Sequence, residues 1–446
     1  MPSSPPSRSV PVVVGSGLTG MSISTTLSRA GVDHVLVGGP PGTLPRLGES
    51  LNLEGTLLLL EMYPELSRFF FPKKTVVGYL ADHQLTCDFD VGQRRVSRVV
   101  FRALGYRAVS EFLQFDRLGF DAALWEATAA SPRCTVVDAK VAGLDYDAAS
   151  DSFAAVRLED GTALSPSYLF DASNHGRLLG QATGMEMRTL GPPQRVAYTH
   201  FHAPDGVPVG VDAWEEATVI LRLFRDTDGL DAIAWCIPLG RYVSVGLSLS
   251  ADESDASDEA LLEATERAYA RYGVRYRERF SRAVPIMGLK HRYFVYDRAA
   301  GANWLLAGPS FAQVWWMAGA GVGTALAAAQ LAPRVLGDPA RWGREYDRYM
   351  RRLVPIHATF EFFASAPREA YVPRELHRYS DRFTTTNLLR LAASTRLRGR
   401  RRGALAGPLL HWIFSRPGVI RDFCDVRRLD PSELPDPQGA AVAALA

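Results

Sequence analysis

Short apolar runs and amphipathic segments alternate near the start of this chain. Residues 10–14 form an apolar, mostly β-branched run, and a segment with helical periodicity follows to about Ala30. A second apolar run, Val35–Val37, comes next. Between the first run and the helical segment lies Gly15-Ser16-Gly17-Leu18-Thr19-Gly20. This order of strand, glycine turn, helix and strand predicts a βαβ unit of the kind that binds dinucleotides.

The three glycines have distinct expected tasks in such a unit. Gly15 permits the tight turn, Gly17 lets backbone N–H groups approach a pyrophosphate, and Gly20 lets helix and strand pack closely. Such units also place an Asp or Glu at the end of the second strand to bind the ribose hydroxyls, but this chain has Gly38 there. A tightly packed turn without a nucleotide remains the alternative interpretation.

The rest of the chain predicts a second sheet and a helical end. Strand-like segments occupy 75–80 and 96–104, and the alternating residues of 217–224, 233–237 and 242–249 predict an antiparallel sheet that covers a site. The buried strand 168–171 ends in a polar turn, and ligands of open parallel sheets lie beyond such strand ends. A long Ala-rich helix is expected from about Gly321 to Leu336, and Arg-rich helices are expected over 341–363 and 385–422.

Composition narrows the class of protein. Hydrophobic content of 47% and charged content of 22% over 446 residues are those of a globular protein with a sizeable core. The net charge of +2 gives no case for nucleic acid, and no apolar run reaches the length of a membrane span. The cysteines form no CxxC pair, which argues against a zinc site and a disulfide framework and fits the cytoplasm: Cys87, Cys134, Cys236 and Cys424.

Four motifs occur in a recognisable order: GSGLTG at 15–20, RLGESL at 46–51, QFDRLGFD at 114–121 and LFDASNHGRLLG at 169–180. Together they resemble the flavin-dependent monooxygenase superfamily with the p-hydroxybenzoate hydroxylase fold, and within it the flavin-dependent halogenases. The resemblance covers 9–335 and implies an α/β fold. A Rossmann-like FAD-binding domain would hold an inserted antiparallel β-sheet substrate domain, followed by a C-terminal helical region. The implied bounds are 9–70 with 105–180 and 290–340 for the FAD-binding domain, 71–104 with 190–289 for the substrate sheet, 341–430 for the helical region and 431–446 for a disordered tail.

The resemblance also implies roles for individual residues. The FAD-contacting set would be Gly15, Gly17 and Gly20 at the pyrophosphate, Arg46 and Ser50 near the flavin, Arg117 at the phosphate or ribityl side, the Val141 backbone at the adenine, Asp171 at the strand end, and Gly308 and Gly321 at the late turn and last helix. From the residues alone, Arg117 could equally form an ion pair with Asp116 or Asp121.

A lysine that holds or relays hypohalous acid follows the GES motif in halogenases. Lys74 fits that role best and Lys73 comes second, while a lysine pair on an exposed turn is the alternative. Glu49 is the second candidate catalytic group. The strand residue Trp235 keeps part of a tryptophan motif of the same family.

Three departures from the family pattern bear on the cofactor. Gly38 and Pro309 stand where acidic FAD anchors are expected, and Trp315-Trp316 replaces an Asp-Pro pair ahead of the flavin ring. Each hydrogen bond to a charged acceptor contributes roughly 1.5–3 kcal/mol. Losing two would weaken FAD binding by about 3–6 kcal/mol, or ~10²–10⁴ in affinity. The sequence therefore predicts FAD that is weakly held or lost.

Three functional hypotheses follow. The first is a flavin-dependent oxidoreductase acting on an aromatic or polyketide-like natural-product intermediate, free or tethered to a carrier protein, with a separate flavin reductase because no second nucleotide motif is present. The second is a scaffold without FAD that performs a redox-neutral cyclisation or rearrangement by acid–base groups. The third is a non-catalytic protein that binds an apolar metabolite. The titratable residues for the second hypothesis are Glu49, Asp82, His83, Asp171 and His175.

Overall fold

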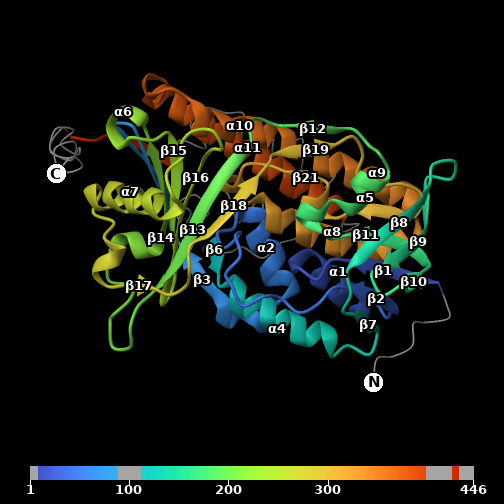
Figure 1. Cartoon of the computed structure of the whole chain (residues 1–446). Coiled ribbons are helices and arrows are strands. Elements are labelled where there is room, and N and C mark those ends of the chain that lie inside the picture. Colours follow the sequence, from blue (N-terminus) through green and yellow to red (C-terminus); the bar gives the residue numbers. More distant parts are fainter. Residues whose placement is uncertain (1–8, 89–111, 398–423, 431–446) are drawn as a thin grey trace.

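The computed structural model describes residues 9–88, 112–397 and 424–430, and in α11 it leaves out the side chains of 383–385 and 396. Helices and strands alternate through the chain, which confirms the predicted α/β class (Figure 1). The predicted strand 96–104, most of the helix expected over 385–422 and the tail 431–446 lie outside the described residues. The predicted domain bounds stay predictions.

A parallel sheet carries the glycine turn. Its strands are, in spatial order, β20 (Trp304–Leu306), β11 (Pro166–Asp171), β1 (Val10–Val14), β2 (His34–Val37) and β7 (Cys134–Val137). All four pairings are parallel, so the carboxyl ends of the strands meet at one edge. Helices α1 (Leu18–Arg29), α4 (Arg117–Ala129) and α8 (Ala320–Gly337) cover the sheet, and α1 packs against both of the others. The inner strands are buried on both faces, which explains their continuous apolar sequence.

Nine strands form a second, larger sheet within the part of the chain that the structure describes. Eight follow one path: β17 (Ser281–Arg282), β13 (Gln194–His202), β16 (Tyr242–Ser250), β15 (Ala232–Leu239), β14 (Ala217–Leu223), β4 (Thr75–Leu80), β5 (His83–Asp88) and β22 (Cys424–Arg428). The ninth, β18 (Met287–His291), also pairs with β13, and every pairing is antiparallel except that of β14 with β4. The predicted antiparallel sheet is therefore present.

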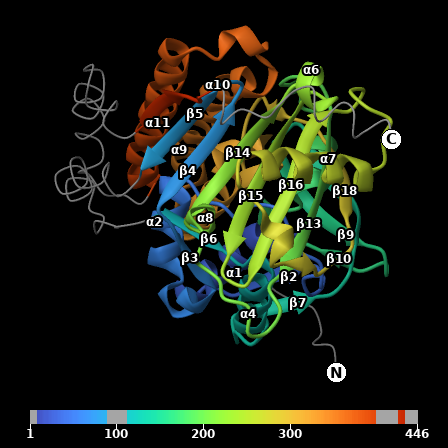
Figure 2. The ribbon, with the colours of Figure 1, turned by 90° about the vertical axis from the view of Figure 1, so that its left-hand side faces the viewer.

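The large sheet separates two hydrophobic cores. Along β15, Ile233, Trp235 and Ile237 face the main core, whereas Ala234 and Cys236 face the second core. This is the period of two that a strand imposes on its side chains. Helix α7 (Asp258–Arg271) covers the outer face of this sheet, as Figure 2 shows. The inner face is therefore the one directed toward the parallel sheet.

Short sheets and helices complete the fold. The remaining strands are β3 (Phe70–Lys73) with β6 (Phe112–Phe115); β8 (Val141–Asp147) with β9 (Ser152–Leu158) and β10 (Ala163–Leu164); and β12 (Met187–Thr189) with β19 (Phe294–Tyr296) and β21 (Ala312–Gln313). The remaining α-helices of the described residues are α2 (Leu53–Met62), α5 (Leu178–Ala182), α6 (Arg225–Asp228), α9 (Pro339–Arg351), α10 (Leu353–Ser365) and α11 (Pro373–Leu397). No helix among the described residues is both long and apolar enough to cross a bilayer.

A buried ion pair fixes the C-terminal helix. Arg390 of α11 lies 3.0 Å from a carboxylate oxygen of Glu54 in α2, and both side chains are almost fully buried. Tyr349 of α9 donates a hydrogen bond to the same carboxylate at 2.8 Å and accepts one from Arg390 at 2.9 Å. Helix α2 is thereby held to α9 and α11, which are distant from it in sequence.

One disulfide corrects the expectation drawn from the cysteines. Cys87 of β5 and Cys424 of β22 are paired, although 337 positions separate them. The two residues face each other in the ladder of neighbouring strands, a proximity that their spacing in the sequence cannot reveal. Cys134 and Cys236 are free and buried. No group of metal-ligating side chains is present among the described residues.

Candidate functional site

A cavity of about 850 Å³ lies between the parallel sheet and the inner face of the large sheet. It begins at the glycine turn 15–19, passes the loop 46–53 and the first turn of α8, and reaches the inner faces of β4, β14 and β15. Helices α10 and α11 also contribute to its wall. Most of its walls are apolar, so the few polar side chains that line it are the candidates for binding or chemistry.

The glycine turn contains two glycines that the protein itself requires. Gly15 has φ of +104°, and a Cβ atom there would lie 2.5 Å from the carbonyl oxygen of Ala172. A Cβ atom on Gly20 would lie 1.7 Å from the carbonyl oxygen of Gly15. Both contacts are between backbone segments that cannot move apart cheaply. Gly15 and Gly20 therefore allow the turn and the close packing of α1.

Gly17 differs, because the fold leaves space beside it. Apart from its chain neighbours, a Cβ atom there would meet only Nη1 of Arg46, at 3.8 Å. Gly17 is the N-cap of α1 and no side chain caps this helix, so the first N–H groups of α1 need another acceptor. The Arg46 guanidinium forms no hydrogen bond or ion pair within the described residues. An open helix N-terminus beside a free guanidinium fits a phosphate group.

A second helix N-terminus opens on the same cavity. Gly319, with φ of +56°, precedes α8 and gives it no side-chain cap. A Cβ atom on Gly321 would meet nothing within 4 Å, so the first turn of α8 is open toward the cavity. Gly308 has a structural task instead, because a Cβ atom there would lie 3.0 Å from Cα of Ala325 in α8.

Asp171 is directed into the protein and does not line the cavity. It accepts hydrogen bonds from Ser173 (N at 2.8 Å and Oγ at 2.6 Å), from the Leu179 N–H at 2.9 Å and from Oγ of Ser310 at 3.2 Å. Burial raises the pKa of this carboxyl group, and the hydrogen bonds act in the opposite direction. Asp171 therefore joins the polar turn after β11 to the turn that contains Pro309.

Arg117 is buried and holds the loop that carries Arg46 in place. Its guanidinium binds both carboxylate oxygens of Asp121, at 3.2 and 2.9 Å, and donates to the carbonyl oxygen of Leu47 at 2.8 Å. Of the two partners that the sequence left open, Asp121 is the one observed, while Asp116 caps α4. Arg117 still lines the cavity, but Val141 does not.

Lys73, rather than Lys74, lies at the cavity. Nζ of Lys74 pairs with Glu216 at 2.6 Å, and about half of each side chain is exposed. Lys73 is 4% exposed and lines the cavity. Consecutive residues of an extended chain point to opposite faces, so only one lysine of the pair can face inward. The predicted placement of Lys74 at the site is therefore corrected to Lys73.

Lys73 belongs to a polar network on the cavity wall. Its Nζ donates to Oγ of Ser50 at 3.0 Å and to the carbonyl oxygen of Leu51 at 2.5 Å. Ser50 lies 3.0 Å from the hydroxyl of Thr218, which also accepts from Nε2 of Gln114 at 2.8 Å. Burial lowers the pKa of Lys73 to about 7. An amine that exchanges its proton near neutral pH is thus held at a fixed place in the wall.

Glu49 stands beside this network and is paired with a histidine. One of its carboxylate oxygens lies 2.6 Å from Nε2 of His200, and both side chains are buried. Burial alone would lower the pKa of His200, but the Glu49 carboxylate outweighs it and raises the pKa above its ordinary value. Asp82 and His83 pair with each other at 2.9 Å and do not line the cavity, whereas His175 does.

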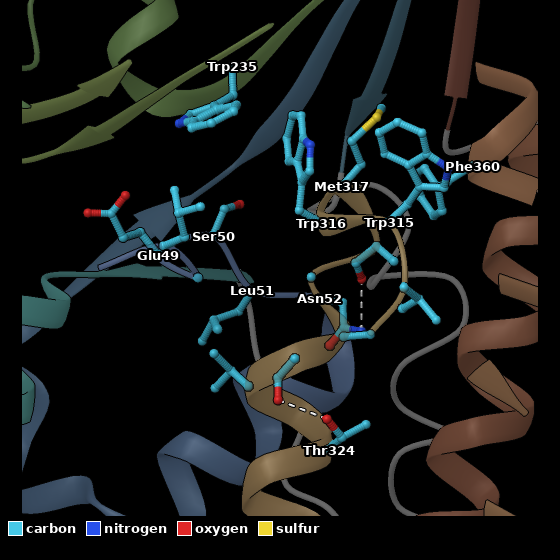
Figure 3. A pocket seen from close by; sticks show the side chains of 18 of the residues that line it. Glu49, Ser50, Leu51, Asn52, Trp235, Trp315, Trp316, Met317, Thr324 and Phe360 are labelled. Carbon is cyan, nitrogen blue, oxygen red and sulfur yellow. Dashed lines mark hydrogen bonds between the residues drawn. The ribbon is translucent and has the colours of Figure 1, made fainter. Parts of the chain in front are cut away.

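The two adjacent tryptophans point in different directions. Figure 3 shows Trp316 directed toward Trp235 and Trp315 directed toward Phe360. Trp315 is buried and donates to Glu361 at 2.5 Å, so it packs the entry to α8. The ring of Trp316 lies 4.6 Å from that of Trp235, and its indole N–H is buried without a partner among the described residues. Both tryptophans therefore line the cavity, Trp316 beside Trp235 and Trp315 in the packing ahead of α8.

The fold is similar to that of solved flavin-dependent halogenases and of a flavoprotein, in agreement with the resemblance drawn from the sequence. No protein-family model and no curated protein matches the chain.

Solved structures do match it, across nearly the whole chain. The flavin-dependent brominase Bmp2 has a TM-score of 0.63 at 14% identity, over 90% of this chain and 98% of that one. The halogenase PltM in complex with phloroglucinol and FAD has a TM-score of 0.64 at 14% identity, over 93% and 85%. A flavoprotein/dehydrogenase from Cytophaga hutchinsonii has a TM-score of 0.61 at 16% identity, over 91% and 98%. At sequence identities this low, the structural similarity shows a shared fold alone.

Proposed function

We propose that this chain is a flavin-dependent oxidoreductase of the monooxygenase or halogenase type. The observation that carries the proposal is the course of the cavity, which connects the open N-terminus of α1 to the open N-terminus of α8 and then reaches the buried amine of Lys73. The packing of the protein itself does not require glycine at 17 or at 321. A bound dinucleotide would require it, because the ligand would fill the space beside both residues.

The residues present fit FAD at both helix ends. The α1 end with Gly17 and Arg46 would take the pyrophosphate, because N–H groups and a guanidinium there favour an anion. The α8 end with Gly321 would take the electron-rich edge of the flavin, since the positive end of a helix dipole stabilises negative charge. Ser50 also lines the cavity.

Other residues of the site support weak rather than tight binding. Pro309 has neither a carboxylate nor an N–H group to offer the ribityl chain, and the side chain of neighbouring Ser310 is already bonded to Asp171. Trp316 further narrows the space ahead of α8. We therefore infer that FAD is exchanged between the enzyme and a separate flavin reductase rather than held permanently.

Bound FAD, once reduced by the separate reductase, would activate molecular oxygen for transfer to the substrate, directly or after conversion of a halide to hypohalous acid. The chain's own residues would then orient and protect the reaction. The apolar walls exclude water, and Ser50 and the Leu51 carbonyl hold the Lys73 amine at a fixed position. This amine would bind the oxidant by hydrogen bonding and transfer protons at Nζ near neutral pH. The Glu49–His200 pair can hold one further proton beside it.

The walls beyond Lys73 indicate the kind of substrate. The lining side chains Trp235 and Ile237 of β15, Leu85 of β5 and Phe363 of α10 are apolar. Such a surface favours an aromatic or polyketide-like molecule, delivered free or on a carrier protein.

A redox-neutral enzyme is the second candidate, and one observation favours it. The Lys73 amine and the Glu49 carboxylate line the same cavity, so an acid–base pair is available there without any cofactor. Such an enzyme would use Trp316 as part of the substrate pocket and would not need an acid at 309.

An FAD titration of the purified protein, followed by flavin fluorescence, separates the candidates. Saturable binding at micromolar FAD supports the first proposal, and assays for oxygen and halide consumption with a reductase would follow. Absence of saturation at millimolar FAD would reject it. Turnover of a metabolite without flavin would then favour the redox-neutral enzyme, and binding without turnover would favour a carrier of apolar metabolites.

A further inference from the structure

The end of β2 lacks the acidic residue that normally recognises the ribose of a bound dinucleotide. The neighbouring strand β7 runs parallel to β2, with Val37 opposite Val137, and the Gly38 N–H donates to the Val137 carbonyl oxygen at 2.9 Å. The residue after Val137 is Asp138. Its carboxylate therefore stands at the same sheet edge as the missing acid, one strand further along.

The end of β2 has no room for a side chain at the usual position. Gly38 has φ of +140°, a conformation that residues with a side chain rarely adopt. A Cβ atom there would also lie 2.7 Å from Oγ of Ser16 and 3.1 Å from its backbone nitrogen. An Asp or Glu at 38 would collide with the glycine turn that it is meant to serve.

Gly39 keeps a space that the Asp138 carboxylate fills. A Cβ atom on Gly39 would lie 2.5 Å from Oδ1 of Asp138 and 3.4 Å from Oδ2. The Ser16 hydroxyl donates to the Gly39 carbonyl oxygen at 2.5 Å, and Ser16 itself lines the cavity beside Gly17. Gly39 thus contacts the Asp138 carboxylate on one side and, on the other, the turn expected to hold the pyrophosphate.

Asp138 is available to a ligand. Its side chain is exposed and makes no hydrogen bond or ion pair with any residue that the structure describes. A carboxylate accepts two hydroxyl hydrogen bonds at once, which suits the adjacent 2′- and 3′-hydroxyl groups of a ribose. Its negative charge disfavours a ribose that carries a 2′-phosphate.

We propose that Asp138, on the strand beside β2, binds the ribose hydroxyls of the adenosine half of the dinucleotide and selects a ribose without a phosphate. This inference rests on the proposed function, because it assumes that a dinucleotide occupies the glycine turn. It accounts for the Gly38-Gly39 pair, which the missing acid alone leaves unexplained.

Binding of nucleotide fragments to the purified full-length chain tests the proposal without any turnover. Isothermal titration with ADP, 2′-deoxy-ADP and 3′-deoxy-ADP would be compared for the wild type, Asp138→Ala and Asp205→Ala. Asp205 is an exposed carboxylate on the loop after β13, so its variant controls for the loss of one surface charge. Circular dichroism of each variant verifies the fold.

We expect Asp138→Ala to weaken ADP binding by about 10- to 100-fold, as for one or two charge-assisted hydrogen bonds. A deoxy-ADP that lacks a hydroxyl bound by Asp138 should bind the wild type more weakly than ADP by a similar factor. Asp138→Ala should bind ADP and that deoxy-ADP with almost equal affinity. Gly39→Ala should weaken ADP binding less, by displacing the carboxylate.

Equal ADP affinity of the wild type and Asp138→Ala would overturn the inference and leave the proposed function standing. A wild type that binds neither ADP nor FAD would overturn the proposed function and the inference with it.

Discussion

The three glycines of the turn 15–20 allow a sharp test of the proposed nucleotide site, because the structure assigns them different tasks. Gly17→Leu should leave the protein folded and abolish FAD and ADP binding. The φ of Gly17 is −74°, which suits any residue, and the nearest atom to an added Cβ is the end of the flexible Arg46 side chain at 3.8 Å. The expected loss of stability is that of a poorer N-cap, about 0.5–1 kcal/mol.

The effect on binding should be much larger than the effect on folding. A leucine at 17 would fill the space through which the first N–H groups of α1 reach a phosphate. Losing two hydrogen bonds to a charged acceptor corresponds to about 3–6 kcal/mol, or ~10²–10⁴ in affinity. Fluorescence titration with FAD measures this change, and thermal unfolding monitored by circular dichroism measures the stability.

Two matched variants complete the test. Gly20→Ala adds a single methyl group whose carbon would lie 1.7 Å from the Gly15 carbonyl oxygen, so it should destabilise the fold by about 3 kcal/mol or more. Gly337→Leu introduces leucine at another glycine with nothing within 4 Å, at the far end of α8, and should change neither property. Wild-type FAD affinity in Gly17→Leu would refute the reasoning, and so would loss of its fold.

Other predictions concern the cavity lysine and the disulfide. Lys73→Met should stop product formation while flavin reoxidation continues, and Lys74→Met should have little effect; equal activities in a product assay would remove Lys73 from the mechanism. The pKa of Lys73 is about 7 in the folded protein against about 10.4 in the unfolded chain, so the wild type should gain stability relative to Lys73→Met as the pH rises from 7 to 10. Thermal unfolding across this pH range would show the gain, and a constant difference between the two proteins would contradict the lowered pKa. Cys87→Ser should destabilise the protein by about 2–5 kcal/mol, and an unchanged denaturant midpoint, or a peptide map without the cross-linked peptide, would exclude the bridge.

Local patterns predicted those features that depend on neighbouring residues in the sequence. The apolar runs around the glycine turn and the alternation in 233–237 indicated the βαβ unit and the large sheet, because each strand imposes its own period. To choose between Lys73 and Lys74, one must know at which residue β3 ends. Sequence patterns do not locate a strand end to a single residue, and a shift of one residue reverses the face to which a side chain points.

Features that depend on distant residues could not be predicted. The Cys87–Cys424 pairing arises because β22 adds to the edge of β5 after more than three hundred intervening residues. The position of Asp138 beside Gly39 follows from the parallel pairing of β2 and β7, and Asp171 is turned inward by hydrogen bonds from Leu179 and Ser310. No local pattern marked His200 as part of the site, because its place there depends on its contact with Glu49, which is distant in sequence.

The buried ion pair between Arg390 and Glu54 has a consequence for how the chain folds during synthesis. Glu54 leaves the ribosome early, in a helix beside the glycine turn, but the guanidinium that compensates its charge is made only when α11 emerges. A carboxylate buried without that partner would destabilise the native packing by roughly 3–5 kcal/mol. The packing around Glu54 therefore reaches its final stability only after α11 has been made.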